Sequence, residues 1–381
     1  MPWKNPLEER YELAVAMAAR LETVAGIARR FDVSRPTAYK FWRRLREGEQ
    51  GMADRPRGPK GVVSERTARW RKWIFKERAQ HPTWGARKLW QRLRWHWPRV
   101  RLPSVRTVER WLQSEGLVRR RCQRLRVVRA GVGDMSSIRS PNDQWTIDWK
   151  GWVRTGDGCK VEPLTIRDAA SRMILWAQPL PNRSDEAVRR VCRILFRRHG
   201  KPKSIRTDQG GPFCGAGLHG LTSLSMWWYT LGITVEFVDR KARIDNNAHE
   251  QMHQIMQAEV FQPPAPTAKI QRQRLRQWQQ TYNQLRPNDA LGGRTPAQCY
   301  RSRPAPMPRP LQPVYPKHWL VRRVAARGTI RLLGQLHFVG RAFAGLRVGC
   351  EPDGSSHHVH YHTLKLHTLN PLTPRAKRGR G

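Results

Sequence analysis

Three acidic residues stand where their carboxylates could do chemistry. Asp148 lies in the middle of the apolar run Gln144–Trp149, where a carboxylate is costly unless it is paired or holds a metal ion. Asp208 ends the run Ser204–Thr207 and precedes two glycines, so it is expected at the carboxyl end of a strand, where α/β sheets place their sites. Glu250 lies on a long helix predicted to follow the last strand of the sheet.

Two strand aspartates and a helical glutamate would form an oxygen-only site that suits Mg²⁺, with Mn²⁺ as a substitute. Two such ions about 4 Å apart can activate a water or a 3′-hydroxyl and stabilise the leaving oxygen of an in-line attack on phosphorus. The alternative is that each acid only pairs with a neighbouring arginine. We therefore predict phosphoryl transfer, with Asp148, Asp208 and Glu250 as metal ligands and catalytic residues.

The elements that must position these acids form a predicted mixed sheet with helices on both faces. Antiparallel strands are expected at residues 143–152, 161–168 and 173–179. Alternating helices and strands are expected after them, at residues 184–199, 204–207, 217–231, 234–238, 246–260 and 268–282.

The charge of the chain indicates the partner. Its 72 Lys and Arg against 29 Asp and Glu leave a net charge of +43, and such an excess favours nucleic acid. With 39% hydrophobic residues and 17 Trp, the chain has enough apolar material for several cores.

No apolar run is long enough to span a bilayer, and the first residues lack the apolar region of a signal peptide. We expect a cytoplasmic protein, nucleoid-associated when bound to DNA.

The 6 cysteines are dispersed singly. This spacing argues against a disulfide framework and a cysteine zinc site, and it predicts reduced core residues.

Two helical modules are expected before the sheet. Between Pro6 and Arg46 the apolar spacing predicts three short helices, with Asp32 in a tight turn and Ser34 as a cap, as in a helix-turn-helix. The outward residues of the third helix are predicted to contact DNA: Arg35, Thr37, Tyr39, Lys40, Arg43 and Arg44. The alternative is a small basic bundle with a solvated face. A second helical unit, at residues 65–116, presents Arg106 and Arg110.

An arginine-rich segment follows and includes Arg119, Arg120 and Arg121. It is predicted to be either a solvated connector or a DNA contact. Near the end, alternating apolar residues around several glycines favour a small β-barrel-like domain. The predicted divisions are a helix-turn-helix domain at 1–52, a linker at 53–64, a second helical domain at 65–117, an arginine-rich linker at 118–140, the core at 141–300, a proline-rich linker at 301–316, a small β domain at 317–370 and a disordered basic tail at 371–381.

Several ordered motifs together resemble one known family. The segments are Val33–Arg35, His81–Leu89, Pro141–Gly151, Thr207–Phe213, Asn246–Glu250, Tyr282–Pro287 and Arg294–Ala297. They are similar to those of insertion-sequence transposases of the DDE type, which have a retroviral-integrase-like catalytic core with an RNase H-like fold. The resemblance covers nearly the whole chain.

This resemblance implies that Asp148, Asp208 and Glu250 bind two Mg²⁺ ions and catalyse end cleavage and strand transfer. The implied partner is double-stranded DNA, as the element's terminal inverted repeats and as target DNA. Because strand transfer holds two ends at once, a homodimer or higher oligomer is expected. The chain departs from the family pattern at Arg240–Asp245, where a Pro-Gly-x-Pro loop is usual, and Asp245 competes with Glu250 by spacing.

Three other hypotheses remain open. The chain could be a catalytically silent, transposase-derived DNA-binding regulator. His249-Glu250-x-x-His253 also matches the helical zinc motif of metalloproteases. Finally, His358, His360 and His362 alternate, so on a strand they would share one side and could bind zinc, although partly exposed strand residues are the simpler interpretation.

Overall fold

The protein is described here from a computed structural model, which describes residues 6–55, 65–118, 138–238 and 247–370. The chain divides into two compact units, Met1–Ala68 and Arg69–Gly381. No helix of the described ranges is long and apolar enough to cross a membrane.

The first unit has the three helices that the apolar spacing predicts. They are α1 (Pro6–Ala19), α2 (Val24–Arg30) and α3 (Arg35–Arg44), followed by the 3₁₀ segment η1 (Leu45–Met52). Ser34 caps α3 by accepting a hydrogen bond from the Thr37 N–H, and Asp32 takes the left-handed conformation in the preceding turn (φ 50°). Leu13, Ile27 and Phe41 form the centre of its apolar core.

The second helical module is made of α4 (Glu65–Gln80), α5 (Ala86–His96) and α6 (Val105–Ser114). Ser104 caps α6 through the Thr107 N–H. Aromatic side chains from the first two helices and the loop between them, among them Trp70 and Trp84, pack with the leucines of α5 and α6. The module was correctly predicted, because its helices carry periodic apolar residues and a serine cap.

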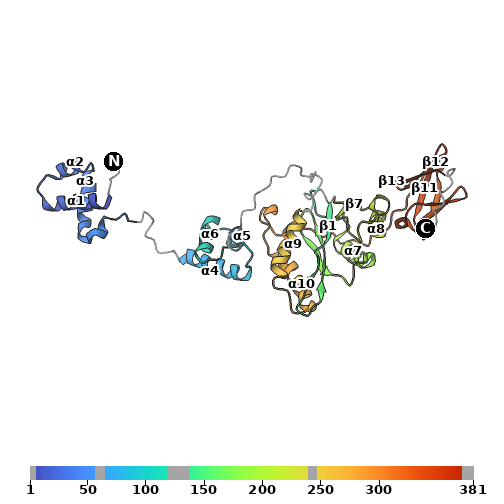
Figure 1. The fold of residues 1–381 in the computed structure, drawn as a ribbon, viewed down its shortest axis with the longest axis horizontal. Helices are drawn as coiled ribbons and strands as arrows, with labels where there is room; N and C mark the ends of the chain where they lie inside the picture. Colours follow the sequence, from blue (N-terminus) through green and yellow to red (C-terminus); the bar gives the residue numbers. More distant parts are fainter. Residues whose placement is uncertain (1–5, 56–64, 119–137, 239–246, 371–381) are drawn as a thin grey trace, which may run out of the picture. The chain divides into compact units, whose positions relative to one another are not determined.

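The core is a five-stranded mixed sheet in the order β5-β4-β1-β6-β7 (Figure 1). Its strands are β1 (Gln144–Trp149), β4 (Pro163–Asp168), β5 (Ile174–Pro179), β6 (Ser204–Thr207) and β7 (Thr234–Phe237). The first three are antiparallel neighbours, whereas β6 pairs in parallel with both β1 and β7. This mixed sheet confirms the predicted α/β core.

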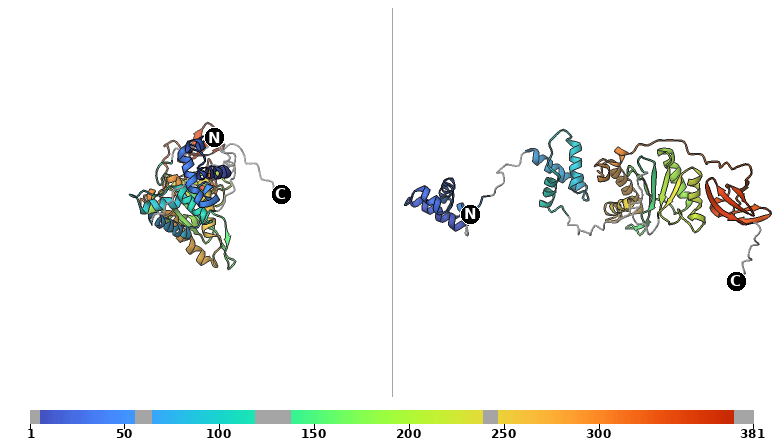
Figure 2. Two further views of the ribbon diagram at one scale, coloured as in Figure 1. Left: turned by 90° about the vertical axis from the view of Figure 1, so that its left-hand side faces the viewer. Right: turned by 90° about the horizontal axis from the view of Figure 1, so that it is seen from above.

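Helices cover both faces of the sheet, and the views in Figures 1 and 2 agree on this. On one face lie α7 (Asp185–His199) and α8 (Ser223–Thr230), which pack against Trp145, Ile147 and Leu164. On the other lie α9 (Asn247–Val260) and α10 (Ala268–Gln284), which bury Met252, Met256 and Leu275 against the sheet.

One helix begins later than its sequence predicts. We expected a helix from residue 217, but α8 starts at Ser223, because Thr222 forms a capping box with Ser225. The segment before it holds the short 3₁₀ turn η3 (Leu218–Gly220) and a bridge between Cys214 and Leu221.

A small hairpin that the sequence pattern did not predict follows β1. Its strands are β2 (Val153–Arg154) and β3 (Lys160–Val161), which are too short to show an alternation of their own.

The C-terminal β domain is not the barrel that we predicted. Strands β8 (Leu320–Arg323), β11 (Arg347–Asp353), β12 (Ser356–Tyr361) and β13 (Leu364–Leu369) form one sheet, while β9 (Thr329–Leu332) and β10 (Gln335–Phe338) form another. No strand pairing closes the two sheets into a barrel in residues 317–370. The two sheets share one apolar core, which Met226 of α8 joins. Alternating apolar and polar residues predict strands with one buried face. They do not determine whether the edge strands of the two sheets pair to close a barrel.

The described cysteines are all free thiols, as expected. Only Cys192 and Cys350 lie in a core, however, and Cys159 is exposed in the hairpin. Cys122 lies outside the described residues.

Candidate active site

Two of the three predicted acids are brought together by strand pairing. In the parallel pair of β1 and β6, Ile147 lies opposite Thr207. Asp148 is the next residue of β1, and Asp208 directly follows the end of β6, so both acids lie at the same end of adjacent strands. This is the arrangement that the positions of the two acids in their strands predicted.

The charges of Asp208 and Glu250 act on Asp148. Burial is the main cause that raises the pKa of Asp148 to about 7, and the negative charges of Asp208 and Glu250 contribute to this value, against a backbone hydrogen bond that lowers it. The Asp148 side chain is 20% exposed, so its carboxyl lies at the edge of the core. Glu250 is exposed on α9. A cation bound among these carboxylates would offset their repulsion. Asp208 and Glu250 are not, however, part of the close group of possible ligands around Asp148 in the described ranges.

The surroundings of Asp208 fit a cation. Its Oδ1 is buried and has no hydrogen-bond partner among the described residues. A Cβ at position 210 would lie 2.8 Å from Asp208 Oδ2, so any residue other than glycine would displace that carboxylate. An unpartnered buried carboxylate oxygen is costly without a ligand, and this observation supports the predicted oxygen site.

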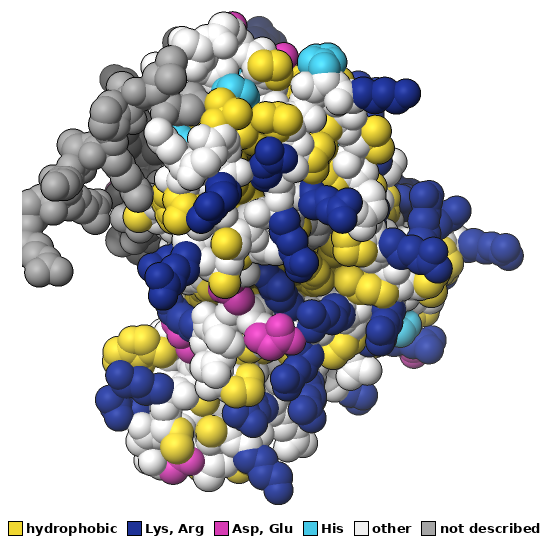
Figure 3. All heavy atoms as spheres, turned by 90° about the vertical axis from the view of Figure 1, so that its right-hand side faces the viewer, with side chains coloured by type: hydrophobic (Ala, Val, Ile, Leu, Met, Phe, Trp, Pro, Cys, Tyr) yellow, Lys and Arg dark blue, Asp and Glu magenta, His cyan; other side chains and the backbone are white. Residues whose placement is uncertain are grey.

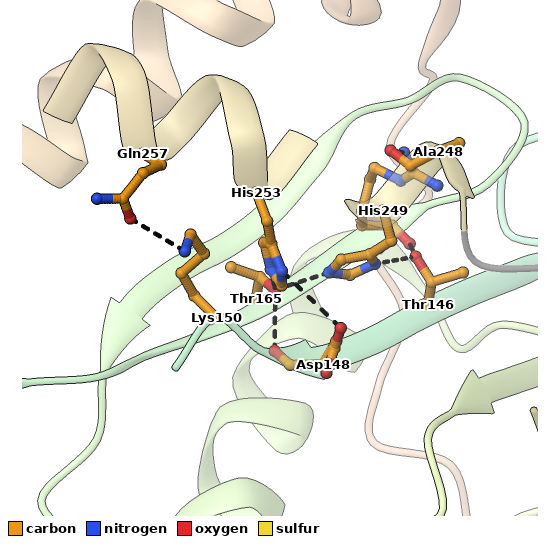
Figure 4. Close-up of polar contacts among 9 residues, drawn as sticks. Thr146, Asp148, Lys150, Thr165, Ala248, His249, His253 and Gln257 are labelled. Carbon is orange, nitrogen blue, oxygen red and sulfur yellow. Dashed lines mark hydrogen bonds and ion pairs between the residues drawn. The ribbon is translucent and has the colours of Figure 1, made fainter. Parts of the chain in front are cut away.

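The histidines of α9 point into the sheet rather than to solvent (Figure 4). The His249 ring is hydrogen-bonded through Nδ1 to Thr146 Oγ1 and through Nε2 to Thr165 Oγ1, at 2.7 Å each. His253 Nε2 lies 2.8 Å from the same Thr165 hydroxyl, and its Nδ1 lies 3.9 Å from Asp148 Oδ2. The threonines alternate with the apolar residues of β1 and β4 that face α7, so they line the opposite face of the sheet.

Burial lowers the pKa of both histidines. The pKa of His253 falls to about 3, and that of His249 falls well below its usual value, with neighbouring positive charges as smaller causes. Both rings are therefore neutral at pH 7, and His253 forms no ion pair with Asp148 at that pH.

Asp148, His249 and His253 place ligand atoms within 4.8 Å of one another, and no other group in the described ranges does so. Three of the four ring nitrogens are already hydrogen-bonded to threonine hydroxyls. A metal held by both histidines would have to displace those bonds. The His-Glu-x-x-His pattern is thus accounted for by two satisfied histidines that join α9 to the sheet.

Two cationic side chains near the acids were not predicted as site residues. Lys150 Nζ lies 3.2 Å from Gln257 Oε1, and the charge of Asp148 acts on it. Arg183 lies over the Trp149 ring at 5.0 Å, and the charge of Asp208 acts on it. The spacing of Lys150, two residues after Asp148, could have indicated the first of these. Arg183 is brought near by tertiary packing alone.

The predicted DNA-contacting residues divide into three groups. On α3, Arg35, Tyr39, Lys40 and Arg43 are exposed, and Thr37 and Arg44 are half-buried. On α6, Arg106 and Arg110 are exposed. The predicted arginine contacts at 119, 120 and 121 lie outside the described residues, and so do the loop Arg240–Asp245 and the basic tail.

The three C-terminal histidines do not share one side of a strand. His358 and His360 lie on β12, each bonded to a carboxylate, Asp353 at 2.9 Å and Glu351 at 3.1 Å. His362 lies beyond the end of β12, in a turn with φ 53°. That turn interrupts the alternation, so the three histidines are not placed on one side as the zinc alternative requires.

Known domain families match parts of this chain. A helix-turn-helix domain family matches residues 9–60, and two integrase core domain families match residues 139–241 and 231–296. Along the chain, the matches to integrase core domains therefore follow the match to a helix-turn-helix domain.

The chain is also similar to an insertion-element protein. A curated relative, the insertion element IS407 uncharacterized 31.7 kDa protein of Burkholderia multivorans, is 25% identical over 192 residues, which is 50% of this chain and 67% of the relative. The resemblance predicted from the motifs is thus confirmed.

Solved structures to which the chain is similar include retroviral integrases. The HTLV-2 integrase catalytic core domain in complex with magnesium is 16% identical, with a TM-score of 0.34 over 42% of this chain and 98% of that one. The simian T-cell lymphotropic virus intasome, in complex with a PP2A regulatory subunit, is 14% identical, with a TM-score of 0.36 over 61% of this chain and 80% of that one.

Proposed function

We propose that the protein is a DNA transposase that binds the terminal inverted repeats of its element and catalyses Mg²⁺-dependent strand cleavage and strand transfer. One observation carries the proposal: Asp148 and Asp208 follow paired residues of adjacent parallel strands, and the charges of Asp208 and Glu250 act on Asp148. A basic chain with a helix-turn-helix domain supports DNA as the substrate.

The residues that would hold two Mg²⁺ ions are Asp148, Asp208 and Glu250. Bound there, the ions would activate a water or a 3′-hydroxyl for attack on phosphorus and stabilise the oxygen that leaves. The chain's own cations support the same substrate, because Lys150 and Arg183 lie near the acids and can attract the phosphate. Neutral His249 and His253 hold α9 against the sheet and leave the positive charge to those cations.

In both steps of the proposed reaction, one oxygen substituent on phosphorus replaces another. In cleavage, water adds and the phosphodiester bond breaks, which frees a 3′-hydroxyl. In strand transfer, that hydroxyl attacks a target phosphodiester, and the target's own 3′-oxygen leaves. Because two ends must be held together, we propose a homodimer or larger assembly on DNA, which the mass of the protein–DNA complex would test.

The function can be tested with purified protein and DNA that contains the flanks of its element. With Mg²⁺ or Mn²⁺, we expect nicks at the element ends, and Asp148→Asn should abolish them while end binding persists. Asp185→Asn, on the first turn of α7 across the sheet, is the matched control and should cut normally. If the wild type binds the ends but never nicks them, the silent-regulator hypothesis replaces the transposase.

A further inference from the structure

The hairpin that follows β1 presents an exposed tryptophan. The Trp152 side chain is 56% exposed, and no other Trp belongs to the exposed large hydrophobic residues of the described chain. The apolar residues of the hairpin strands face inward: Val153 and Val161 pair with each other and pack on the core under α9 and α10. Trp152 therefore lies on the outer side, although an apolar core is available on the inner one.

Two cations accompany the ring. Lys160 Nζ lies 4.7 Å and Arg154 Cζ 5.9 Å from the centre of the Trp152 ring, and both side chains are exposed. Both cations lie over the ring in cation–π contacts, and Trp152 nevertheless remains 56% exposed. An aromatic face beside lysine and arginine is the combination by which proteins bind the bases and phosphates of a nucleic-acid strand.

The hairpin is held rigidly by the loop between α9 and α10. The Gly156 and Asp157 N–H groups donate to Ala265 O and Pro266 O, at 2.9 and 2.8 Å. The Asp157 carboxylate accepts hydrogen bonds from the Thr155 hydroxyl and from the Cys159 and Ala268 N–H groups. The acid of the turn is thus engaged by the protein's own donors, which leaves the outer side of the hairpin cationic.

The platform lies close to the candidate active site. Trp152 follows Asp148 by four residues, so their Cα atoms are at most about 14 Å apart even if the chain is fully extended. A nucleotide stacked on Trp152 would be within a few nucleotides of a phosphate at the acids. Stacking on an aromatic ring does not depend on which base is stacked, because every base has a π-face.

We propose that Trp152, with Arg154 and Lys160, forms a stacking platform for an unpaired base of the DNA strand next to the reacting phosphate. This inference rests on the transposase function proposed above and adds a binding site to it. It predicts a contact with single-stranded or frayed DNA that does not depend on base sequence.

The test uses the full-length protein without divalent metal, a fluorescein-labelled 15-residue oligo-dT, and a 15-base-pair duplex. Trp152→Ala should weaken oligo-dT binding about tenfold, the loss of one base–aromatic stack, while duplex binding changes less than about twofold. Trp152→Phe keeps a ring and should recover most of the affinity. Phe338→Ala, an equally exposed aromatic (50%) in the β domain, is the matched control and should leave both affinities unchanged.

A second measurement reports stacking directly. An oligo-dT with 2-aminopurine at its centre should lose fluorescence on binding the wild type and Trp152→Phe, and much less on binding Trp152→Ala. Unchanged oligo-dT affinity in Trp152→Ala, or an equal loss for duplex DNA, overturns the platform. So does a changed oligomeric mass with unchanged DNA binding, which would make the hairpin a protein contact.

The two proposals can fail separately. If the wild type cuts element ends but Trp152→Ala binds oligo-dT normally, only the platform is wrong. If the wild type never cuts element DNA, the transposase proposal is wrong, whatever the result with Trp152.

Discussion

Asp148 has a carboxyl whose ionisation changes strongly on folding. Its usual pKa is about 4, and burial and the two neighbouring acids raise it to about 7 in the folded chain. A carboxyl whose folded-state pKa is raised destabilises the fold as it ionises, so this contribution to stability is lost as pH rises from about 4 to about 7. The two buried histidines act in the opposite direction, because their lowered pKa makes the fold less stable as pH falls below about 6.5.

Asp148→Asn should therefore change the pH dependence of stability in a defined way. In metal-free protein, the free energy of unfolding of the variant minus that of the wild type should increase by roughly 2–3 kcal/mol between pH 5 and pH 8. Taking the difference removes the histidine contribution, which the two proteins share. Urea unfolding of both proteins at several pH values measures this difference in free energy of unfolding. A difference that stays constant with pH would show that Asp148 ionises normally.

Magnesium should act on the same residue. We expect Mg²⁺ to raise the melting temperature of the wild type, and to raise it more at pH 8 than at pH 6, because protons compete with the ion for Asp148. Asp148→Asn should respond much less at both pH values. An equal response of variant and wild type would place the ion elsewhere.

At the scale of elements, buried polar side chains of the sheet position the start of α9. The Arg167 guanidinium donates to Ala248 O at 2.6 Å, and Thr146 and Thr165 are bonded to His249, directly before Glu250. Thr165 is fully buried, and its hydroxyl also lies within hydrogen-bonding distance of His253. These contacts join β1 and β4, and thereby Asp148, to the helix that carries Glu250.

Thr165→Val should loosen this connection without changing the shape of the core. Removing the hydroxyl leaves the Nε2 atoms of His249 and His253 without that partner, so the free energy of unfolding should fall by roughly 1–3 kcal/mol. DNA cleavage should fall more than DNA binding, since the helix that carries Glu250 is affected and α3 is not. Thr234→Val, at an exposed position of β7, is the control and should change stability by no more than about 0.5 kcal/mol. Equal effects of the two substitutions would contradict the positioning role of Thr165.

At the scale of the whole molecule, charge is the dominant property. The net charge of +43 is spread over all parts of the chain, and the face drawn in Figure 3 shows many Lys and Arg side chains with few acidic ones between them. Affinity for DNA should therefore be strong at low salt and should fall steeply as salt is added. Specific contacts must be separated from this general attraction by variants of equal charge.

Arg43→Ala and Arg327→Ala make such a pair. Both remove one exposed arginine, the first from α3 of the helix-turn-helix and the second from the turn before β9. If Arg43 contacts a base, we expect Arg43→Ala to weaken binding to the element ends by roughly 1–3 kcal/mol. If it contacts a phosphate, the slope of log affinity against log salt concentration should become smaller by about one. Arg327→Ala should have little effect on either quantity, and equal effects would indicate that charge alone determines binding.

Local patterns of the sequence were enough to predict the helices of the N-terminal modules, the mixed sheet, and the strand ends that bring Asp148 and Asp208 together. Each of these depends on periodicity, capping or the position of an acid in a short apolar run, and such signals are readable within a few residues. The late start of α8, the two open sheets of the C-terminal domain, and the short hairpin with Trp152 were not predictable in this way.

Only the tertiary structure decided what the histidines of α9 do. Their spacing on a helix matches a zinc motif, but folding places Thr146 and Thr165 opposite them, and hydroxyls of the sheet satisfy their ring nitrogens. The sequence determined which side chains share a face of an element, because that depends on the backbone period. Which groups meet across two elements depends on strand register and helix packing, and these are settled by contacts between residues far apart in the chain.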